Sequence, residues 1–513
     1  MRSRDAAIVL LSCLLASCAT SALDMAPERP DRPWTPATTA DGEIIAGERG
    51  VSNGAGGFVL PANPALAVVT PPPAVDHTKV YTLADLIDLA ESNNPTTRIA
   101  WNEARRVALA AGIAQSLYLP QITAGALTGY QDSNGARSSV ASQSFNNNQS
   151  LNGIVSAASM QWLLFDFGER IAVIDAAKQA SVVSNVAFTE AHQQVIYAVA
   201  LAFYANSAAQ ARLATANQSF KNAQAVQAAA EDNYHHGVGT VTEAAQGQQG
   251  TAQAKLALVQ ATGGAQNAYL ALLTAIGISP MTKIKVADVS GRKLSASSAA
   301  PVEKIIADAL ARRPDVQGAY AAQKASIAKV HAAEAEFMPK VFVTANGTYS
   351  EGNLNVTAIP SAGELPPTLN LNGGRFGGTQ LTGSVFAGVA VPVYDAGIRA
   401  AILEQAREGA DSAAARLDRI RQDAVRQIVL ADNTLHTSLS AYAASQSLAA
   451  AAQKTFDSAL AGYRSGVSSI TELNLAQTQL LQAKNASSDA HSAALSAAAT
   501  LALATGALGQ APR

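Results

Sequence analysis

Two related stretches of the sequence place a tyrosine, a glycine and a glutamate at the same spacing. The first reads YHHGVGTVTEAAQGQ over residues 234–248, and the second reads YRSGVSSITELNLAQ over residues 463–477. A glutamate carboxylate repels anions and attracts cations, and a tyrosine hydroxyl can donate or accept a hydrogen bond. Each stretch interrupts a long alanine-rich segment at a glycine, which permits the positive φ of a tight turn. The pattern predicts two helical hairpin tips.

No sequence pattern of an enzyme accompanies these residues. The sequence contains no Walker loop, no HExxH, no G-x-S-x-G elbow and no cysteine nucleophile. His235 and His236 are adjacent, so they point apart on a helix and do not predict a metal site. The alternative is that protonation of these histidines below about pH 7 tunes how the first tip closes against its neighbours, but a plain surface position is the favoured interpretation. We expect no enzymatic activity, no cofactor and no metal.

The composition excludes some partners and explains little of the core. The net charge is −2, so no global field favours nucleic acid. Charged residues make up 14% of the chain, well below the usual share of a soluble protein. Much of the 48% hydrophobic content is alanine, which favours helices and close backbone approach over a thick apolar core.

The N-terminus has the form of a secretory signal. Arg2 and Arg4 precede a short apolar run, and residues 15–18 read LASC, which resembles the bacterial lipoprotein box. We therefore expect cleavage before Cys18 and its acylation with palmitate. The alternative is an ordinary signal peptide cut a few residues later. After Cys18 no run of 18 apolar residues follows, so a helical membrane span is not expected.

The chain repeats itself. Residues 83–122 align with 302–341 at an offset of 219, and 164–180 align with 393–409 at an offset of 229. The second pair shares a D-x-G pattern, and the offset of 229 persists through both tips. Residues 169–236 contain neither proline nor glycine, so a helix there would extend roughly 100 Å. Each half thus predicts a helix, a strand pair and a long helical hairpin.

The parts are expected at the following limits. They are the signal peptide 1–17, a lipid-anchored proline-rich tether or equatorial segment 18–79, the first repeat 80–278, an equatorial linker 279–301, the second repeat 302–508 and a tail 509–513. The strand pairs are expected at about 121–165 and about 340–394, and the tips near 237 and 466. Four strands cannot close a barrel, so strands in a membrane require other copies of the chain.

This arrangement resembles the TolC-type outer-membrane channel family of outer membrane efflux proteins, in its lipoprotein branch. The resemblance rests on the repeat, the helix–proline–strand pairs, the D-x-G entries and the two tips. It implies an α+β membrane protein and a homotrimer, in which long α-helices form an α-barrel tunnel in the periplasm. It also implies that four strands per chain contribute to a 12-stranded transmembrane β-barrel. The expected location is the Gram-negative outer membrane, lipid-anchored and extending into the periplasm.

The resemblance also implies roles for the tips. They would dock a periplasmic adaptor protein and close as an iris, with Glu472 ringing the entrance and Tyr463 and Glu243 joining neighbouring hairpins. Leu475 stands where the family often has a second acid, and Ser468 where a basic partner is expected. A purely structural turn and a solvated helix-start carboxylate remain the alternatives. The expected docking residues are Gly237, Val238, Gly239, Thr240, Ser465, Gly466, Val467 and Ser468.

The implied function is the passive exit duct of a tripartite export system. Energy would come from an inner-membrane pump of the RND or ABC class, and outer-membrane lipid would surround the strands. Small-molecule or drug efflux is favoured over type I protein secretion, chiefly because of the lipoprotein box. A structural coiled-coil surface lipoprotein is a further alternative, but it does not explain strand pairs at matching places in both halves.

Overall fold

Two compact units, 1–75 and 76–513, make up the chain. The computed structural model describes residues 25–27, 29–31, 33–49, 58–67, 75–134, 138–140, 143–145, 148–291, 294, 302–356 and 374–509. In the first unit, β1 (Pro36–Thr38) pairs antiparallel with β2 (Ile44–Arg49), and η2 (Pro64–Ala67) is a single 3₁₀ turn. The described part of the first unit therefore has little regular structure, as its prolines predict.

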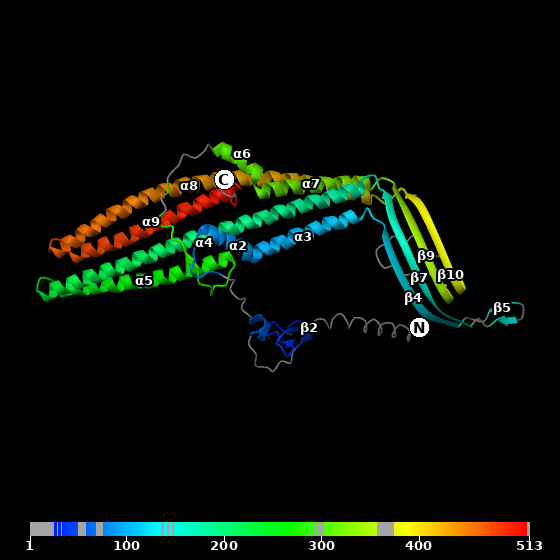
Figure 1. Cartoon of the computed structure of the whole chain (residues 1–513), viewed down its shortest axis with the longest axis horizontal. Coiled ribbons are helices and arrows are strands. Elements are labelled where there is room, and N and C mark those ends of the chain that lie inside the picture. Colours follow the sequence, from blue (N-terminus) through cyan, green and yellow to red (C-terminus); the bar gives the residue numbers. More distant parts are fainter. Residues whose placement is uncertain are drawn as a thin grey trace, which may run out of the picture. The chain divides into compact units, whose positions relative to one another are not determined.

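The second unit contains both repeats (Figure 1). The first comprises β3 (Val80–Tyr81), α2 (Leu83–Asn93), α3 (Pro95–Ser116), β4 (Gln121–Asn134), β5 (Ser138–Val140), β6 (Gln143–Phe145), β7 (Asn148–Phe165), α4 (Glu169–His235) and α5 (Val241–Ile276). The second comprises α6 (Val302–Arg312), α7 (Pro314–Ala335), β9 (Lys340–Val356), β10 (Gly374–Ala390), α8 (Ile398–Arg464) and α9 (Ile470–Ala504), and β8 (Lys285–Val286) lies in the linker between the repeats.

The two repeats match helix by helix. The helices α2 and α6 each have 11 residues, α3 and α7 each have 22, and α4 and α8 each have 67. The last helices, α5 and α9, have 36 and 35 residues. The internal twofold repeat read from the sequence is thus confirmed in the fold. The expected linker is not wholly irregular, because its β8 pairs in parallel with β3.

The four long strands form one antiparallel sheet in the order β10-β9-β7-β4. Gln121 pairs with Gln161 within the first repeat, and Lys340 pairs with Ala390 within the second. The repeats join where β7 pairs with β9, as in the register of Phe165 with Val341. In the single chain β4 and β10 are therefore the outer strands. The strand β10 ends at Ala390, four residues before the limit expected from the sequence.

Each D-x-G motif lies between a strand and the long helix that follows it: three residues separate β7 from α4, and residues 391–397 separate β10 from α8. Phe167 and Gly168 have φ values of 52° and 101°, which turn β7 directly into α4. The Asp166 carboxylate then accepts hydrogen bonds from the N–H groups of Gly168 and Arg170, at 3.3 and 2.9 Å. It also holds the Arg170 guanidinium at 2.7 Å in a buried ion pair. Asp166 thus pairs with N–H groups at the start of α4 from two residues before its N-cap, Gly168.

The second junction repeats this geometry in a more exposed setting. Ala396 and Gly397 have φ values of 57° and 86°, and Asp395 accepts from the N–H groups of Gly397 and Arg399. The Asp395–Arg399 ion pair spans 3.1 Å, with the two side chains 27% and 20% exposed. The D-x-G pattern therefore marks the same strand-to-helix junction in both halves.

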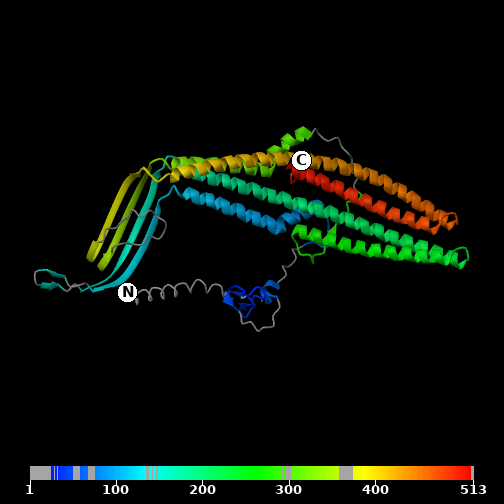
Figure 2. The same ribbon diagram turned by 180° about the vertical axis from the view of Figure 1, so that it is seen from behind.

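The long hairpins α4–α5 and α8–α9 run side by side to their tips (Figures 1 and 2). Among the described helices, α4 alone is long and apolar enough, by length and composition, to cross a membrane. It packs against α3, α5, α7 and α9, which places it among other helices of the second unit. At the tip end, Val226 and Ala230 of α4 pack against the apolar residues of α8 and α9.

Candidate functional site

The first tip is a tight reversal between α4 and α5. Gly237 has a φ of 72° and donates its N–H to the Tyr234 carbonyl at 3.0 Å. The N–H groups of Val238 and Gly239 both donate to the Asn233 carbonyl at 2.9 Å. These bonds satisfy the carbonyls that the end of a helix leaves open, and the left-handed φ favours glycine.

The second tip has the same backbone plan. Gly466 has a φ of 76° and donates to the Tyr463 carbonyl at 3.1 Å. Val467 and Ser468 donate to the Gly462 carbonyl at 2.8 and 3.2 Å. Val238 and Val467 are 81% and 84% exposed at the two ends. The predicted tip residues thus lie together at two equivalent, exposed turns.

Both predicted tip carboxylates close a capping box. The Thr240 N–H donates to Glu243 Oε2 at 3.1 Å, while the Glu243 N–H donates to Thr240 Oγ1 at 3.2 Å. Ser469 and Glu472 exchange the equivalent bonds, both at 3.2 Å. Ser469 was missed in the sequence, although T-V-T-E and S-I-T-E both fit the S/T-x-x-E pattern. Glu472 is therefore held at the start of α9 whatever further role it has.

Each tip needs one glycine where the reversing chain passes the end of the first helix. A Cβ on Gly239 would lie 3.1 Å from Asn233 Cβ, which is too close for the neighbour to stay in place. In the second tip a Cβ on Gly462 would collide with the Ser468 hydroxyl. The equivalent positions thus hold asparagine facing glycine in one tip and glycine facing serine in the other. The glycine is therefore the later residue of the pair in the first tip and the earlier residue in the second, while the backbone of the turn is the same.

Tyr463 connects the two tips within one chain. Its side chain is 4% exposed, and it belongs to the apolar cluster that includes Val226 and Ala230 of α4. Burial raises the pKa of the Tyr463 hydroxyl, the Asn233 side chain beside it lowers that pKa, and the nearby Glu243 carboxylate raises it. The Glu243 carboxylate is close enough to act on the Tyr463 hydroxyl within one chain, whereas the predicted role of the two residues in joining neighbouring hairpins stays a prediction.

The predicted entrance is less acidic than a double carboxylate ring. Leu475 is 58% exposed and follows Glu472 by one helical turn, so the two share a face of α9. Ser468 carries no charge, so the salt bridge implied by the resemblance has no cation at this position. His236 Nδ1 lies 3.3 Å from Asp232, on the exposed surface of the first tip. Among the described residues no group of three or more His, Cys, Asp or Glu forms a metal site.

A polar groove lies between α5 and α9, behind the tips. Its wall includes the amide side chains of Gln246, Gln249, Gln253, Gln260, Asn474 and Gln477. The Gln477 amide donates to the Ser219 carbonyl of α4 at 3.0 Å, which ties α9 to the first hairpin. The amides give this part of the wall a hydrated surface without net charge.

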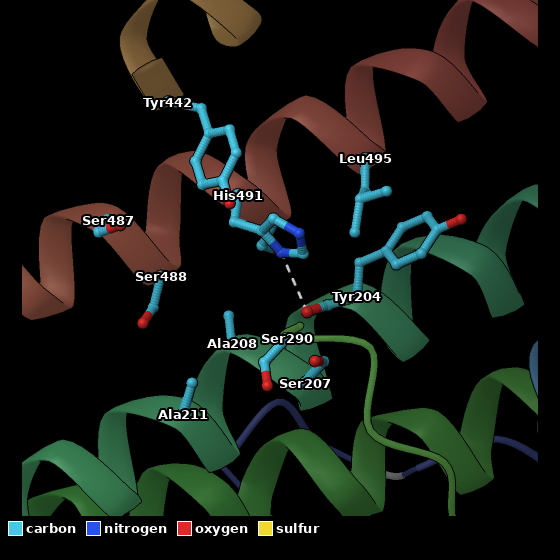
Figure 3. Close-up of a pocket in the computed structure, with 11 residues that line it drawn as sticks. Tyr204, Ser207, Ala208, Ala211, Ser290, Tyr442, Ser487, Ser488, His491 and Leu495 are labelled. Carbon is cyan, nitrogen blue, oxygen red and sulfur yellow. Dashed lines mark hydrogen bonds between the residues drawn. The ribbon is translucent and has the colours of Figure 1, made fainter. Parts of the chain in front are cut away.

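A small cavity lies among the long helices, farther from the tips, and was not predicted from the sequence (Figure 3). His491 is 6% exposed there, and its ring centroid lies 5.1 Å from that of Tyr442. Ser492 Oγ donates to the Tyr204 carbonyl at 3.0 Å. The cavity joins α4, α8 and α9, whose residues are far apart in the sequence, so no local motif signals it. Its serine and imidazole lining makes it polar.

The predicted acylation site, Cys18, lies outside the residues that the structure describes.

Comparisons with known proteins agree with this architecture. The sequence profile described as outer membrane efflux protein matches residues 86–278 and 305–507. Protein CyaE of Bordetella pertussis is 25% identical over 430 residues, which cover 82% of this chain and 83% of that protein.

Solved outer-membrane channels share the fold. The Campylobacter jejuni CmeC channel superposes with a TM-score of 0.68 at 18% identity, over 83% of this chain and 85% of CmeC. The open Neisseria gonorrhoeae MtrE channel gives a TM-score of 0.64 at 21% identity, over 83% of this chain and 88% of MtrE.

The expected fold class is therefore confirmed. Channels of this kind are trimers with a helical barrel and a β-barrel, and the long helices and four-stranded sheet of this chain have the fold of one subunit. They are passive channels and not enzymes. With both repeats matched almost completely by the profile, the chain belongs to the outer membrane efflux protein family.

Proposed function

We propose that the chain is the exit duct of a tripartite export system and that its tips form the periplasmic mouth. The observation that carries this proposal is the pair of equivalent capped tips, where Tyr234, Val238 and Val241 are exposed on the first and Val467 is exposed on the second. Exposed apolar side chains that gather at one end of a protein mark a candidate surface for binding a partner. The partner is a periplasmic adaptor protein, which links the duct to an inner-membrane pump of the RND or ABC class.

The proposed cargo is a small molecule or drug, as the lipoprotein box favours. Acylation of Cys18 would add a lipid anchor in the outer membrane. An unfolded polypeptide in type I secretion is the alternative cargo. Deletion of the gene distinguishes the two cargoes. If the cargo is a small molecule, we expect the deletion strain to retain dye and to become more susceptible to drugs. Loss of a secreted polypeptide with unchanged susceptibility would replace this cargo with the alternative.

Docking is tested by a double substitution at the exposed valines. Val238→Asp with Val467→Asp places charge on both tips, so we expect export to be lost while trimers and single-channel conductance persist. Val238→Ile with Val467→Ile retains the apolar surface and is the matched control, which we expect to export normally. Normal export by the aspartate variant would overturn the docking role.

A further inference from the structure

The four-stranded sheet has one apolar face and one polar face. One row across the strands is apolar, and it consists of Ile122, Met160, Ala345 and Val385. The next row is polar, and it consists of Thr123, Ser159, Asn346 and Ser384. Successive side chains of a strand point to opposite faces, so the two rows lie on opposite sides of the sheet. In an outer-membrane barrel the apolar side faces lipid and the polar side faces the interior.

The apolar face ends in aromatic side chains where the sheet meets the long helices. Trp162 lies opposite Val343 on this face. Phe165 lies opposite Val341 on the same face, and its ring centroid is 4.7 Å from that of Phe167. Phe165 and Phe167 are 52% and 51% exposed. Girdles of aromatic residues flank the apolar band of such barrels, so these side chains mark the edge of the lipid-facing surface.

A groove between α4 and α7 begins at this edge. Its lining next to the sheet is apolar and includes Phe167, Ile171 and Met338. Ile171 and Met338 are 56% and 45% exposed. Because Phe167 belongs to both the groove and the aromatic edge, the apolar end of the groove is continuous with the face that meets lipid. The groove therefore extends the lipid-facing surface onto the helices.

The end of the groove farther from the sheet is polar, and its polar lining consists of Asp175, His331 and Glu334. Asp175 is exposed and has no ion pair among the described residues. The Arg407 guanidinium lies 3.9 Å from Glu334 and 3.6 Å from Glu404, so these two carboxylates share it. Lys178 follows Asp175 by three residues on the same side of α4, but it does not line the groove. The lining thus offers two carboxylates, which suit a cationic ammonium group.

We propose that this groove binds one molecule of phosphatidylethanolamine from the periplasmic leaflet of the outer membrane. An acyl chain lies against Phe167, Ile171 and Met338, and the primary ammonium of the headgroup lies between Asp175 and Glu334. Asp175 is one helical turn beyond Ile171, which matches the order of chain and headgroup in a lipid. The site depends on the outer-membrane fold of the family and is independent of the proposed role of the tips.

The equivalent positions of the other repeat form a poorer site. At the offset of 229, Ala396 and Ala400 replace Phe167 and Ile171. At the offset of 219, residue 115 is a glutamine, so the charge of Glu334 is missing as well. The aromatic ring, the isoleucine and one carboxylate are all lost. We therefore expect one lipid site per chain and not two.

Native mass spectrometry of the full-length trimer tests the proposal. Trimers are extracted in mild detergent, delipidated and given equal amounts of phosphatidylethanolamine and phosphatidylglycerol with identical acyl chains. We expect up to one retained lipid per chain and about fivefold more phosphatidylethanolamine, the ratio that a partly exposed ion pair can give. An equal or inverted ratio would overturn the assignment of an ammonium lipid. Absence of any retained lipid would overturn the site itself.

Two carboxylate variants test the headgroup end. Asp175→Asn with Glu334→Gln should bring the two lipids to equal retention, because neither headgroup then meets a carboxylate. Glu408→Gln with Asp411→Asn removes the same charge from exposed positions of α8 outside the groove, and it should keep the wild-type ratio. A wild-type ratio in the groove variant would contradict the role of Asp175 and Glu334.

A single substitution tests the acyl-chain end. Ile171→Asp places a charge among the apolar side chains, so it should abolish retention of both lipids. Ala400→Asp, at the equivalent exposed position of α8, is the matched control and should retain lipid as the wild type does. Trimers on gels and single-channel conductance show that both variants are folded. Normal retention by Ile171→Asp would overturn the groove, whereas export through the unaltered tips reports separately on the proposed function.

Discussion

Asn94 and Arg313 occupy equivalent positions in the two repeats, and each binds the carbonyl near the end of a long helix. Asn94 Nδ2 donates to the Ala275 carbonyl of α5 at 3.0 Å, and Arg313 Nη1 donates to the Ala504 carbonyl of α9 at 2.8 Å. The two alanines are themselves separated by 229 residues. A conserved geometry with a changed side chain therefore anchors both returning helices.

Arg313 should contribute more to stability than Asn94. Its guanidinium also binds Asp315 and the Gln427 side chain, and its side chain is 8% exposed. Its charge is further favoured at a helix C-terminus. We expect Arg313→Met to lower stability by about 2–3 kcal/mol and Asn94→Ala by about 1 kcal/mol. The temperature at which trimers dissociate on a denaturing gel measures both, and equal effects would contradict this ranking.

The two strand-to-helix junctions should respond differently to the same substitution. Arg170 also donates hydrogen bonds to the carbonyls of Leu117, Leu163 and Leu164. Its loss would leave the buried Asp166 carboxylate without its cationic partner. Arg170→Met should therefore cost about 3–5 kcal/mol. Arg399→Met is the matched control and should lower the trimer dissociation temperature much less, because its ion pair is partly exposed. A larger loss for Arg399→Met would show that the second junction is buried in the assembly.

The effect of Gly462→Ala on stability should change sign with the residue at position 468. Gly462→Ala alone should destabilise by about 1 kcal/mol, because its Cβ meets the Ser468 side chain. In a Ser468→Gly background the collision is removed, and alanine in a helix should then stabilise by about 0.5–1 kcal/mol. Thermal dissociation of the four variants of this cycle gives the coupling directly. Additive effects would contradict the close approach of these residues.

Glu472 should affect ion selectivity without loss of folding. Glutamine can hold the capping box, so Glu472→Gln removes only the charge. We expect a lower cation preference in planar bilayers, seen as a smaller reversal potential in a salt gradient. Glu243→Gln is the matched control. Glu243 is half-buried beside Tyr463, so removal of its charge should change the ion selectivity of the channel less. Unchanged selectivity in Glu472→Gln would leave the residue as a helix cap alone.

Tyr463 should make the contact between tips sensitive to alkali. Its pKa is raised from 10.0 in the folded chain, chiefly by burial, so the neutral form is favoured there. The resulting stability is fully present below the unfolded pKa and is lost as pH rises through the folded pKa. Trimers of the wild-type chain should thus lose stability above about pH 10 more steeply than Tyr463→Phe. Parallel profiles for the two proteins would exclude this contribution.

Local signals in the sequence were enough to predict the repeat, the tips and the junctions. Glycine after a long helix and D-x-G before one describe a few consecutive residues, so their geometry follows from backbone sterics and capping. The strand limits were less predictable, because β10 stops at Ala390 although alternation continues through Val391. Alternation reports which face a residue occupies and not where pairing ends.

Contacts between distant segments needed the structure. Arg313 reaches Ala504 and Gln427, and the polar cavity at His491 combines three helices. Such side chains give no periodic pattern, because each depends on how helices pack after they form. The burial of Tyr463 against Val226 and Ala230 of α4 belongs to the same class, and no pattern in the sequence predicted it.

The exchange of glycine between facing positions restricts how these tips can evolve. Residues 233 and 239 hold asparagine and glycine, whereas residues 462 and 468 hold glycine and serine. A side chain at both facing positions brings their atoms closer than ordinary contact, so the effect of a substitution on one side depends on the residue that faces it. Conversion of one pattern into the other passes either through two glycines or through a close contact that neighbouring atoms relieve by shifting. The two tips thus reach the same turn with different residues at the facing positions.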